Sequence, residues 1–204
     1  MQKDVNTEAR IKETAKKLFQ EKGFDAVRTR EIAEAAGINS ALLHYYFRSK
    51  EKLFHLIMVE SIGEMFLFLR QIINDSETSL SEKIDLIVSG YIDVIKGNPN
   101  LALFVLNELN SDSGRIIQES GIVKDMLINS SLYDQINEQL KKKAIKISPL
   151  HIMLNTISLS VMPVMARPLI NYLYHMETEG VNDFIEERRK LIPFWIKNML
   201  QLEE

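Results

Sequence analysis

The sequence predicts an all-α protein of about nine helices, in which three short helices containing a helix-turn-helix precede a larger helical domain. Apolar residues recur at helical spacing in nearly every segment. The chain contains no run of alternating β-branched residues and no Asn-Gly or Asp-Gly pair that would mark a β-hairpin. We expect one domain at residues 1–48 and a second at residues 49–204.

The first three helices are expected to be short. Gly23 should end the first helix, whose apolar face carries Ile11, Ala15, Leu18 and Phe19. Thr29 is expected to cap the second helix, which stops at Gly37. The segment 39–47 follows after a very short connection and predicts the third helix.

The second domain is expected to begin with a long helix at residues 49–74, capped by Ser49 and free of proline. Ser79 or Ser81 should cap the next helix, and Ser148 should open a later one. The other expected segments are helices at 79–97, 99–110, near 121–146 and near 181–202, with a weaker stretch at 111–120.

The residue types exclude several classes of protein. No cysteine is present, which rules out a disulfide scaffold, a cysteine-based zinc site and a thiol nucleophile, and fits a reducing cytosol. The N-terminal segment is charged and lacks the apolar stretch of a secretory signal. The most apolar late segment, 151–170, is too polar and too short for a membrane span. We therefore expect a cytoplasmic protein with no membrane partner.

Charge is distributed unevenly along the chain. Residues 1–50 hold 10 Lys and Arg against 7 Asp and Glu, whereas the remaining residues hold 15 against 21. A basic N-terminal end on an acidic chain suggests that only this end meets a polyanion such as nucleic acid.

Residues 29–47 have the spacing of a helix-turn-helix. Ala33 lies four residues before Gly37, and Leu43 lies six residues after it. Two helices that cross near a right angle need a small residue at their contact and a left-handed residue in the turn. Leu43 would then anchor the second helix of the pair. A helical hairpin without a DNA-binding role would show the same spacing, so the pattern alone leaves both interpretations open.

A specific resemblance covers roughly residues 8–56, which include the stretch LFQEKGFDAVRTREIAEAAGINSALLHYYFRSKEKLF. This stretch closely resembles the N-terminal domain of the TetR family of transcriptional regulators. The resemblance implies a three-helix DNA-binding domain at 1–48 and an effector-binding and dimerisation domain at 49–204. It also implies that the third helix enters the major groove, that the last two helices form a dimer, and that a small effector shifts the two DNA-binding domains apart.

Helical angles sort the third helix into a buried face and a face toward DNA. Leu43 and Phe47 share the buried face. The residues expected to face the groove or its rim are Asn39, Ser40, Ala41, Leu42 and Tyr45. Asn39 and Ser40 can hydrogen-bond to bases, and the two aliphatic residues after them can contact thymine methyl groups.

The resemblance adds contacts outside this set. His44, Tyr46 and Lys50 stand where family members contact DNA phosphates. Arg30 stands where some members reach a base. Thr29 can offer its hydroxyl and its backbone N–H to a phosphate at a helix N-terminus.

His44 departs from the family pattern, which usually carries a tyrosine at this position. If a nearby phosphate favours the charged imidazolium, operator affinity should weaken as pH rises from about 6 to about 8. The alternative is that His44 is a neutral filler, and the sequence leaves the two readings open.

A ligand cavity is expected among the middle helices, because soft apolar residues recur there and polar residues interrupt apolar runs. The residues expected to line it are Phe66, Tyr91, Phe104, Glu108, Met126, Asn155, Ser158 and Met162. An ordinary core would show the same methionine and aromatic stripes. The family resemblance is what favours the cavity.

The last helix predicts a dimer interface, because its apolar face is wide for a terminal helix and carries the only tryptophan. The residues expected at the interface are Phe184, Arg188, Leu191, Ile192, Trp195, Ile196 and Met199. A two-fold, four-helix interface would bury this face. The alternative is that the helix packs only onto its own domain.

These observations predict a homodimeric, ligand-responsive transcriptional regulator. We expect a repressor that binds a palindromic operator in double-stranded DNA and is released by a small, largely apolar effector. The alternative is an activator or partner-recruiting regulator without small-molecule control, and a helical enzyme or carrier is a further rival. No zinc-protease histidine pair, P-loop or Gly-x-Ser-x-Gly occurs, so we expect no enzyme activity, cofactor or metal.

Overall fold

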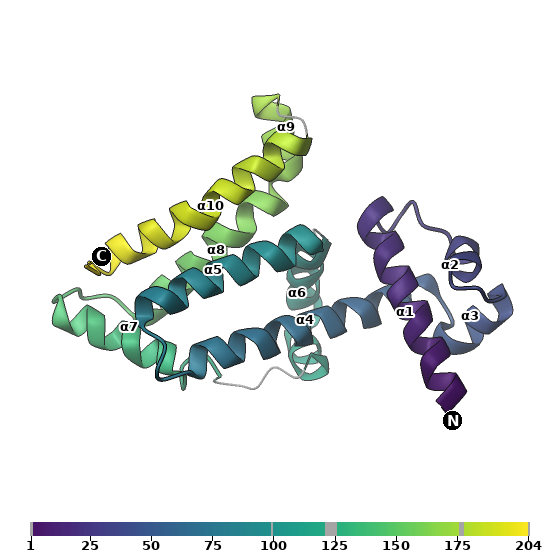
Figure 1. Cartoon of the computed structure of the whole chain (residues 1–204), viewed down its shortest axis with the longest axis horizontal. Helices are drawn as coiled ribbons and strands as arrows, with labels where there is room; N and C mark the ends of the chain where they lie inside the picture. The colour runs from purple at the N-terminus through teal and green to yellow at the C-terminus, as the bar shows by residue number, and fades with distance from the viewer. Residues whose placement is uncertain (1, 99, 121–125, 176–177, 204) are drawn as a thin grey trace. The chain divides into compact units, whose positions relative to one another are not determined.

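The computed structural model describes residues 2–98, 100–120, 126–175 and 178–203, which form ten α-helices and no β-strand (Figure 1). The predicted all-α class is confirmed, with about one helix more than expected. The helices are α1 (Gln2–Lys22), α2 (Thr29–Ala35), α3 (Ser40–Phe47), α4 (Lys50–Asn74), α5 (Leu80–Gly97), α6 (Asn100–Glu119), α7 (Ser131–Lys142), α8 (Pro149–Met165), α9 (Arg167–Tyr174) and α10 (Thr178–Met199).

Contacts divide the chain into two compact units, an N-terminal unit at Met1–Gly63 and a C-terminal unit at Glu64–Glu204. The division falls inside α4, later than the domain boundary expected between residues 48 and 49. The reason is that the first half of α4 buries Leu53, Ile57 and Ile62 almost completely. This half of the helix therefore belongs to the core of the N-terminal unit.

The ends of the first helices have local chemical causes. Gly23 follows α1 with a φ of 81°, a left-handed conformation that glycine adopts without steric cost. The Ser49 hydroxyl accepts a hydrogen bond from the backbone N–H of Lys52 at 3.2 Å and so caps α4, as predicted. The predicted cap at Thr29 is wrong by one residue. Arg28 occupies the N-cap position with an extended backbone and no side-chain bond, and Thr29 is the first residue of α2.

The C-terminal unit is built around α5, which packs against α8 and α10, and α8 and α10 also pack against each other (Figure 1). Its core is almost entirely aliphatic. The fully or nearly fully buried members include Val88 and Ile92 on α5, Ile152 on α8, and Ile185, Ile192 and Ile196 on α10.

Several elements of the C-terminal unit differ from the expected segments. The stretch at 111–119, expected to be weak, continues α6. The helix expected near 121–146 begins only at Ser131, because the hydroxyl of Ser130 caps the backbone N–H of Tyr133 at 3.2 Å. Residues 121–125 lie outside the described chain. The helix α9 was not expected as a separate element, and Pro168 lies in its first turn.

None of the described helices is by itself long and apolar enough to cross a membrane. Only α8 and α9 taken together pass such a test by length and composition, and they are bent by 62° relative to each other.

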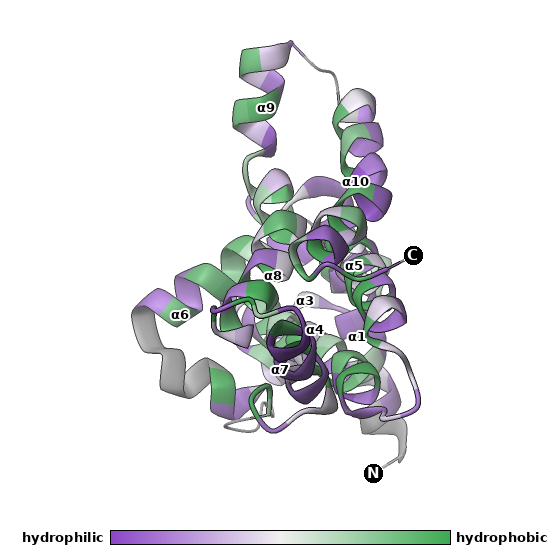
Figure 2. Cartoon of the chain, turned by 90° about the vertical axis from the view of Figure 1, so that its left-hand side faces the viewer, coloured by the Kyte–Doolittle hydropathy of each residue, from purple (hydrophilic) through white to green (hydrophobic). Residues whose placement is uncertain are grey.

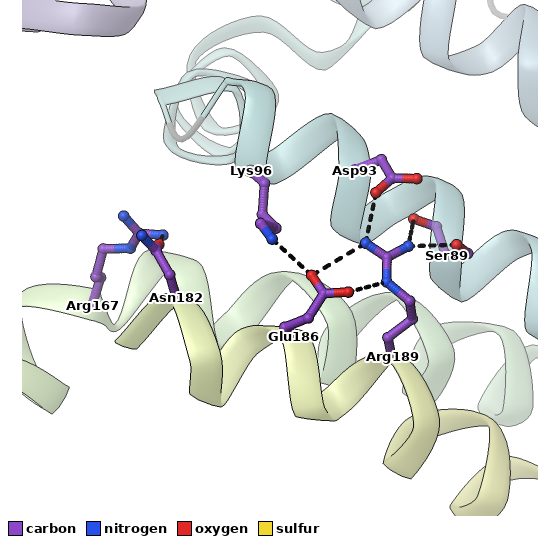
Figure 3. Close-up of polar contacts among 7 residues, drawn as sticks. All are labelled: Ser89, Asp93, Lys96, Arg167, Asn182, Glu186 and Arg189. Carbon is purple, nitrogen blue, oxygen red and sulfur yellow. Dashed lines mark hydrogen bonds and ion pairs between the residues drawn. The ribbon is translucent and has the colours of Figure 1, made fainter. Parts of the chain in front are cut away.

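A polar network joins α5 to α10 (Figure 3). The Arg189 guanidinium donates to Glu186 and Asp93, each at 2.6 Å, and to the backbone oxygen of Ser89 at 3.1 Å. Lys96 donates to the second carboxylate oxygen of Glu186 at 2.7 Å. Hydrogen bonds from these two cations hold the pKa of Glu186 at about 2, well below its ordinary value.

Lys83 on α5 is completely buried, which is unusual for a lysine. Its ammonium donates to the Ser131 hydroxyl and to Oε1 of Gln135, both at 2.9 Å on α7. The Gln135 amide donates in turn to the backbone oxygen of Thr78 at 3.0 Å. Burial lowers the pKa of Lys83. Lys83 thus connects α5 to α7, and through Gln135 to the loop before α5. The sequence pattern did not predict these hydrogen bonds.

Candidate DNA-binding surface, cavity and dimer face

The helix-turn-helix has the geometry that its spacing predicts. Gly37 takes a φ of 65°, in the left-handed region. The backbone N–H of Ile38 donates to the oxygen of Ala33 at 2.9 Å, which closes the turn after α2. Ala33, Leu43 and Phe47 are buried, so the contact between α2 and α3 uses a small residue and two apolar anchors.

The opposite side of α3 is open. Ser40, Ala41, His44 and Tyr45 are exposed, whereas Leu42 and Tyr46 are half-buried. Tyr45 is 77% exposed, and its ring meets that of Tyr46 edge to face at 5.4 Å between centroids. A tyrosine ring offers apolar area that is favourable to bury and a hydroxyl that can hydrogen-bond, so the exposed side of α3 is suited to bind a partner.

Asn39 has a structural role that the sequence interpretation missed. Its Oδ1 accepts a hydrogen bond from the backbone N–H of Leu42 at 2.8 Å and so caps α3. The side-chain amide nitrogen keeps both of its N–H donors for another partner. Asn is among the residues preferred at helix N-caps, so its place at the start of the expected third helix was a signal for this role.

The other residues expected to contact DNA differ in how far they are already bound to groups within the protein. Thr29 is exposed at the start of α2. Arg30 is also exposed, and its Nε donates to Glu34 at 2.7 Å. Exposed ion pairs contribute little to stability, so this one can exchange for a phosphate or a base. Lys50 is half-buried and is bonded inside the N-terminal unit, to the backbone oxygens of Phe24 and Val27.

An apolar cavity of about 80 Å³ lies within the C-terminal unit. It is lined by residues of α4, α5, α7 and α8 and by two residues before α7. The lining residues are Phe66, Leu69, Ile73, Ile84, Ile87, Tyr91, Met126, Leu127, Leu132, Ile136, Ile152, Met153, Thr156 and Ile157. Only the hydroxyls of Tyr91 and Thr156 are polar side-chain groups in this set, and burial raises the pKa of Tyr91 to about 12.

Three of the eight residues expected at a cavity line this one, namely Phe66, Tyr91 and Met126. The other five, Phe104, Glu108, Asn155, Ser158 and Met162, do not line it. The last three of these are exposed, because α8 turns Met153, Thr156 and Ile157 toward the cavity and its opposite side outward. The aliphatic lining was missed, since Leu and Ile at helical spacing look the same in a cavity and in a core.

The expected dimer interface requires a correction. Ile192 and Ile196 are 0% exposed in the core of their own unit and so are not available to a partner. Leu191 and Met199 are exposed, at 40% and 43%. Phe184, Arg188 and Trp195 are half-buried, because the Arg188 guanidinium lies over both rings and donates to the backbone oxygen of Leu159 on α8, at 3.1 and 3.2 Å.

Both α8 and α10 nevertheless carry apolar residues that are not buried, and we call this set the α8–α10 face. It consists of the exposed residues Leu154 and Met162 on α8 and Leu191 and Met199 on α10, with the half-buried Trp195. The amide of Asn155 contacts the sulfur of Met199 at 3.8 Å, so the α8 and α10 parts of the face adjoin there. No residue of α9 is buried, and Figure 2 shows α9 rising with the start of α10 from the other helices of its unit.

A helix-turn-helix with an exposed second helix, followed by a larger helical unit, is the arrangement found in helix-turn-helix transcriptional regulators. The sequence model described as "Bacterial regulatory proteins, tetR family" matches residues 11–57. The chain belongs to the TetR family of transcriptional regulators.

Relatives and solved structures agree with this assignment. The chain is 28% identical over 200 residues to the probable HTH-type transcriptional regulator YttP of Bacillus subtilis (strain 168), covering 97% of this chain and 95% of that protein. It is 25% identical over 109 residues to the fatty acid metabolism regulator protein of the same organism, covering 53% and 56%. A TetR/AcrR-family regulator from Thermobifida fusca YX-ER1 shares the fold, with a TM-score of 0.65, 18% identity and coverage of 92% and 97%.

Proposed function

We propose that this regulator is a homodimeric repressor that binds a palindromic operator and is released by an effector with a fatty-acyl chain. The observation that carries the proposal is an apolar cavity in a chain whose N-terminal unit presents an exposed recognition helix. A regulator without small-molecule control, the alternative, would be expected to have no such cavity.

The DNA-binding part of the proposal uses the exposed side of α3 and the start of α2. Ser40 and the Asn39 amide donors would read base edges, Ala41 and Leu42 would contact thymine methyl groups, and Tyr45 would lie at the groove edge. Thr29 would bind phosphate at the α2 N-terminus, with His44 and Tyr46 as further phosphate contacts. One such surface is small, and two of them about 34 Å apart would read the half-sites of a palindrome.

The dimer in this proposal forms through the α8–α10 face. Exposed apolar side chains from two adjoining helices can pair with the same face on a second copy by a two-fold rotation, which gives a four-helix interface. Trp195 and Met199 would be the central contacts.

The effector class follows from the cavity and from one relative. The lining offers almost only aliphatic and aromatic surface, with two hydroxyls, which suits an alkyl chain. Its 80 Å³ is smaller than the roughly 300–1,000 Å³ of a typical ligand pocket, so the effector must widen it. Met126 and Met153 can adapt to such a change. A relative that is similar to this chain over about half of its length is named a fatty acid metabolism regulator protein.

Release would result from a shift between conformations. DNA selects the arrangement in which the two recognition helices fit successive major grooves, and an effector favours another arrangement by its difference in affinity for the two. A repressor that leaves its operator in this way permits transcription.

The proposal is tested by selecting bound duplexes from a random pool with the purified protein and then adding saturated fatty acids, or their coenzyme A esters, of increasing chain length. We expect a palindromic sequence to emerge and acyl compounds to release it. Ile152→Phe, which fills the cavity, should bind the same duplex and resist release.

A matched pair of variants controls the DNA arm. Tyr45→Ala should lose affinity for the selected duplex, whereas Tyr172→Ala on α9, equally exposed at 78%, should not. Failure to recover any duplex would overturn the proposed DNA recognition. A recovered duplex that no acyl compound releases would overturn only the effector class.

A further inference from the structure

Lys50, at the start of α4, is bound to the loop between α1 and α2. Its Nζ donates to the backbone oxygen of Phe24 at 2.9 Å and to that of Val27 at 3.1 Å. It also lies 4.1 Å from the centroid of the Phe24 ring, within the range of a cation–π contact. Three contacts from one ammonium group therefore converge on residues 24–27.

The loop that Lys50 binds is fixed on its other side by an aromatic cluster. The Phe24 ring lies 4.6 Å from that of Phe54 and 5.8 Å from that of Phe19, between centroids. Val27 is 1% exposed. The side chains of Phe24 and Val27 are therefore packed against the core, and their backbone oxygens are held by the ammonium of Lys50.

An ammonium has three N–H donors, and two of those on Lys50 are bonded to backbone oxygens. The Phe24 ring occupies a further side of the group. A lysine that binds DNA phosphate is normally a solvated point charge on a flexible stem. Lys50 is instead half-buried and held from inside the N-terminal unit.

The bound loop leads directly into the DNA-facing end of α2. Val27 is followed by Arg28, the N-cap residue, and then by Thr29, the first residue of the helix. The direction of the backbone N–H groups at this end depends on where the loop is held. Lys50 therefore connects the start of α4 to the start of α2.

We propose that Lys50 is a positioning residue, which orients the N-terminus of α2 toward DNA by holding the backbone oxygens of Phe24 and Val27, and that it is not a phosphate contact. This inference rests on the proposed DNA recognition. It replaces the phosphate contact that the family resemblance implied for this position.

The two roles differ in how salt affects binding. Each phosphate that a cation neutralises contributes about 0.9 to the slope of log affinity against log salt concentration, because a counterion is released. Removal of a phosphate contact lowers that slope by about 1. Removal of an internal positioning contact weakens binding and leaves the slope unchanged.

The experiment compares Lys50→Met with Lys52→Met, which removes an exposed lysine charge two residues away. Amide hydrogen exchange of residues 24–28 is measured in the DNA-free protein. Affinity for a duplex selected by the wild-type protein is then measured over a range of salt concentrations. Lys50→Arg is the rescue variant, since a guanidinium can donate to both oxygens and stack on the Phe24 ring.

We expect Lys50→Met to exchange faster at residues 24–28 and to bind DNA on the order of tenfold more weakly with an unchanged salt slope. Lys52→Met should leave the exchange as it is, and Lys50→Arg should restore protection and most of the affinity. Unchanged exchange in Lys50→Met, or a salt slope lower by about 1, would overturn the proposal. If the wild-type protein selects no duplex, the DNA recognition fails, and the exchange data still decide whether Lys50 holds the loop.

Discussion

Asn39 caps α3, and the same exposed side chain lies on the part of the helix that is proposed to meet DNA. Its side-chain oxygen accepts a hydrogen bond from the backbone N–H of Leu42 at 2.8 Å, which leaves the two N–H donors of the amide for another partner. The cap therefore fixes the position from which the amide donors can reach a base. The same logic applies to Lys50, whose bonds lie inside the unit and whose effect on DNA is indirect.

Two substitutions of Asn39 should separate capping from recognition. Asn39→Ala removes the cap and should lower the free energy of unfolding by about 1 kcal/mol. Asn39→Asp keeps a capping oxygen, so its stability in urea unfolding should match wild type, but it loses both amide donors and adds a negative charge. Its affinity for the selected duplex, measured by fluorescence anisotropy, should fall sharply. Wild-type DNA binding by Asn39→Asp would show that the amide takes no part in recognition.

His44 is exposed on the face of α3 that is proposed to meet DNA. If its imidazolium contacts a phosphate, affinity for the selected duplex should weaken between about pH 6 and about pH 8, as the charge is lost. His44→Gln should bind with little dependence on pH over that range. Anisotropy titrations of both proteins at several pH values test this, and parallel pH profiles would identify His44 as a neutral filler.

Several helix ends could be predicted from single residues with a known local effect. Gly23 and Gly37 take positive φ values, and Ser49, Ser79 and Ser148 cap their helices as expected. The starts of α7 and α9 could not be predicted in this way. Ser130 is one of many serines, and whether it caps a helix depends on packing of Leu132 and Ile136 against other helices.

Gly90 on α5 lies against the ring of Phe68 on α4. A Cβ built there would lie 2.3 Å from Cε1 of Phe68, whereas one at Gly97 would meet nothing within 4 Å. Gly90→Ala should therefore force Phe68 aside and destabilise the protein by about 1 kcal/mol or more. Gly97→Ala should stabilise it by up to about 1 kcal/mol, because glycine costs conformational entropy in a helix. Urea unfolding measures the stability of both variants. If Gly90→Ala were as stable as wild type, the Phe68 ring would move aside without an energetic cost.

The network between α5 and α10 should make stability depend on pH. The Glu186 pKa is lowered from 4.5 to about 2, so between these values the unfolded chain binds a proton that the folded chain does not. The stabilisation is complete above about pH 5 and is lost as pH falls toward about 2. Solvent screening keeps the effect small, since Glu186 is 43% exposed. The urea midpoint of Glu186→Gln should fall less between about pH 5 and about pH 3 than that of wild type. An identical fall in the two proteins would contradict this.

At the scale of the whole molecule, the sequence could not predict which face of a helix lines the cavity, which joins the core and which is exposed. Met153, Thr156 and Ile157 face the cavity, whereas Ser158 and Met162 on the same helix face outward. Because α8 is apolar on more than one side, its periodicity does not say which side meets the cavity. The wide apolar face of α10 had the same ambiguity, and two of the residues expected at the dimer interface, Ile192 and Ile196, lie in the core.

The α8–α10 face should govern assembly. Leu154→Glu, at a side chain that is 60% exposed on this face, should convert the proposed dimer into a monomer and weaken binding to a palindromic duplex. Leu86→Glu is the control, since this leucine on α5 is 41% exposed outside the face. Light scattering at micromolar concentration measures the mass of each. A monomeric wild-type protein, or a dimeric Leu154→Glu variant, would contradict the proposed interface.

The N-terminal unit ends in the middle of α4, and this matters for anyone who wishes to exchange modules between regulators. A chimera joined after residue 48 would discard Leu53, Ile57 and Ile62, which are all nearly fully buried. A chimera joined at Gly63 keeps these three residues within the compact unit to which they belong. The unit to be transferred is therefore longer than its first three helices, and the first half of α4 must be included with them.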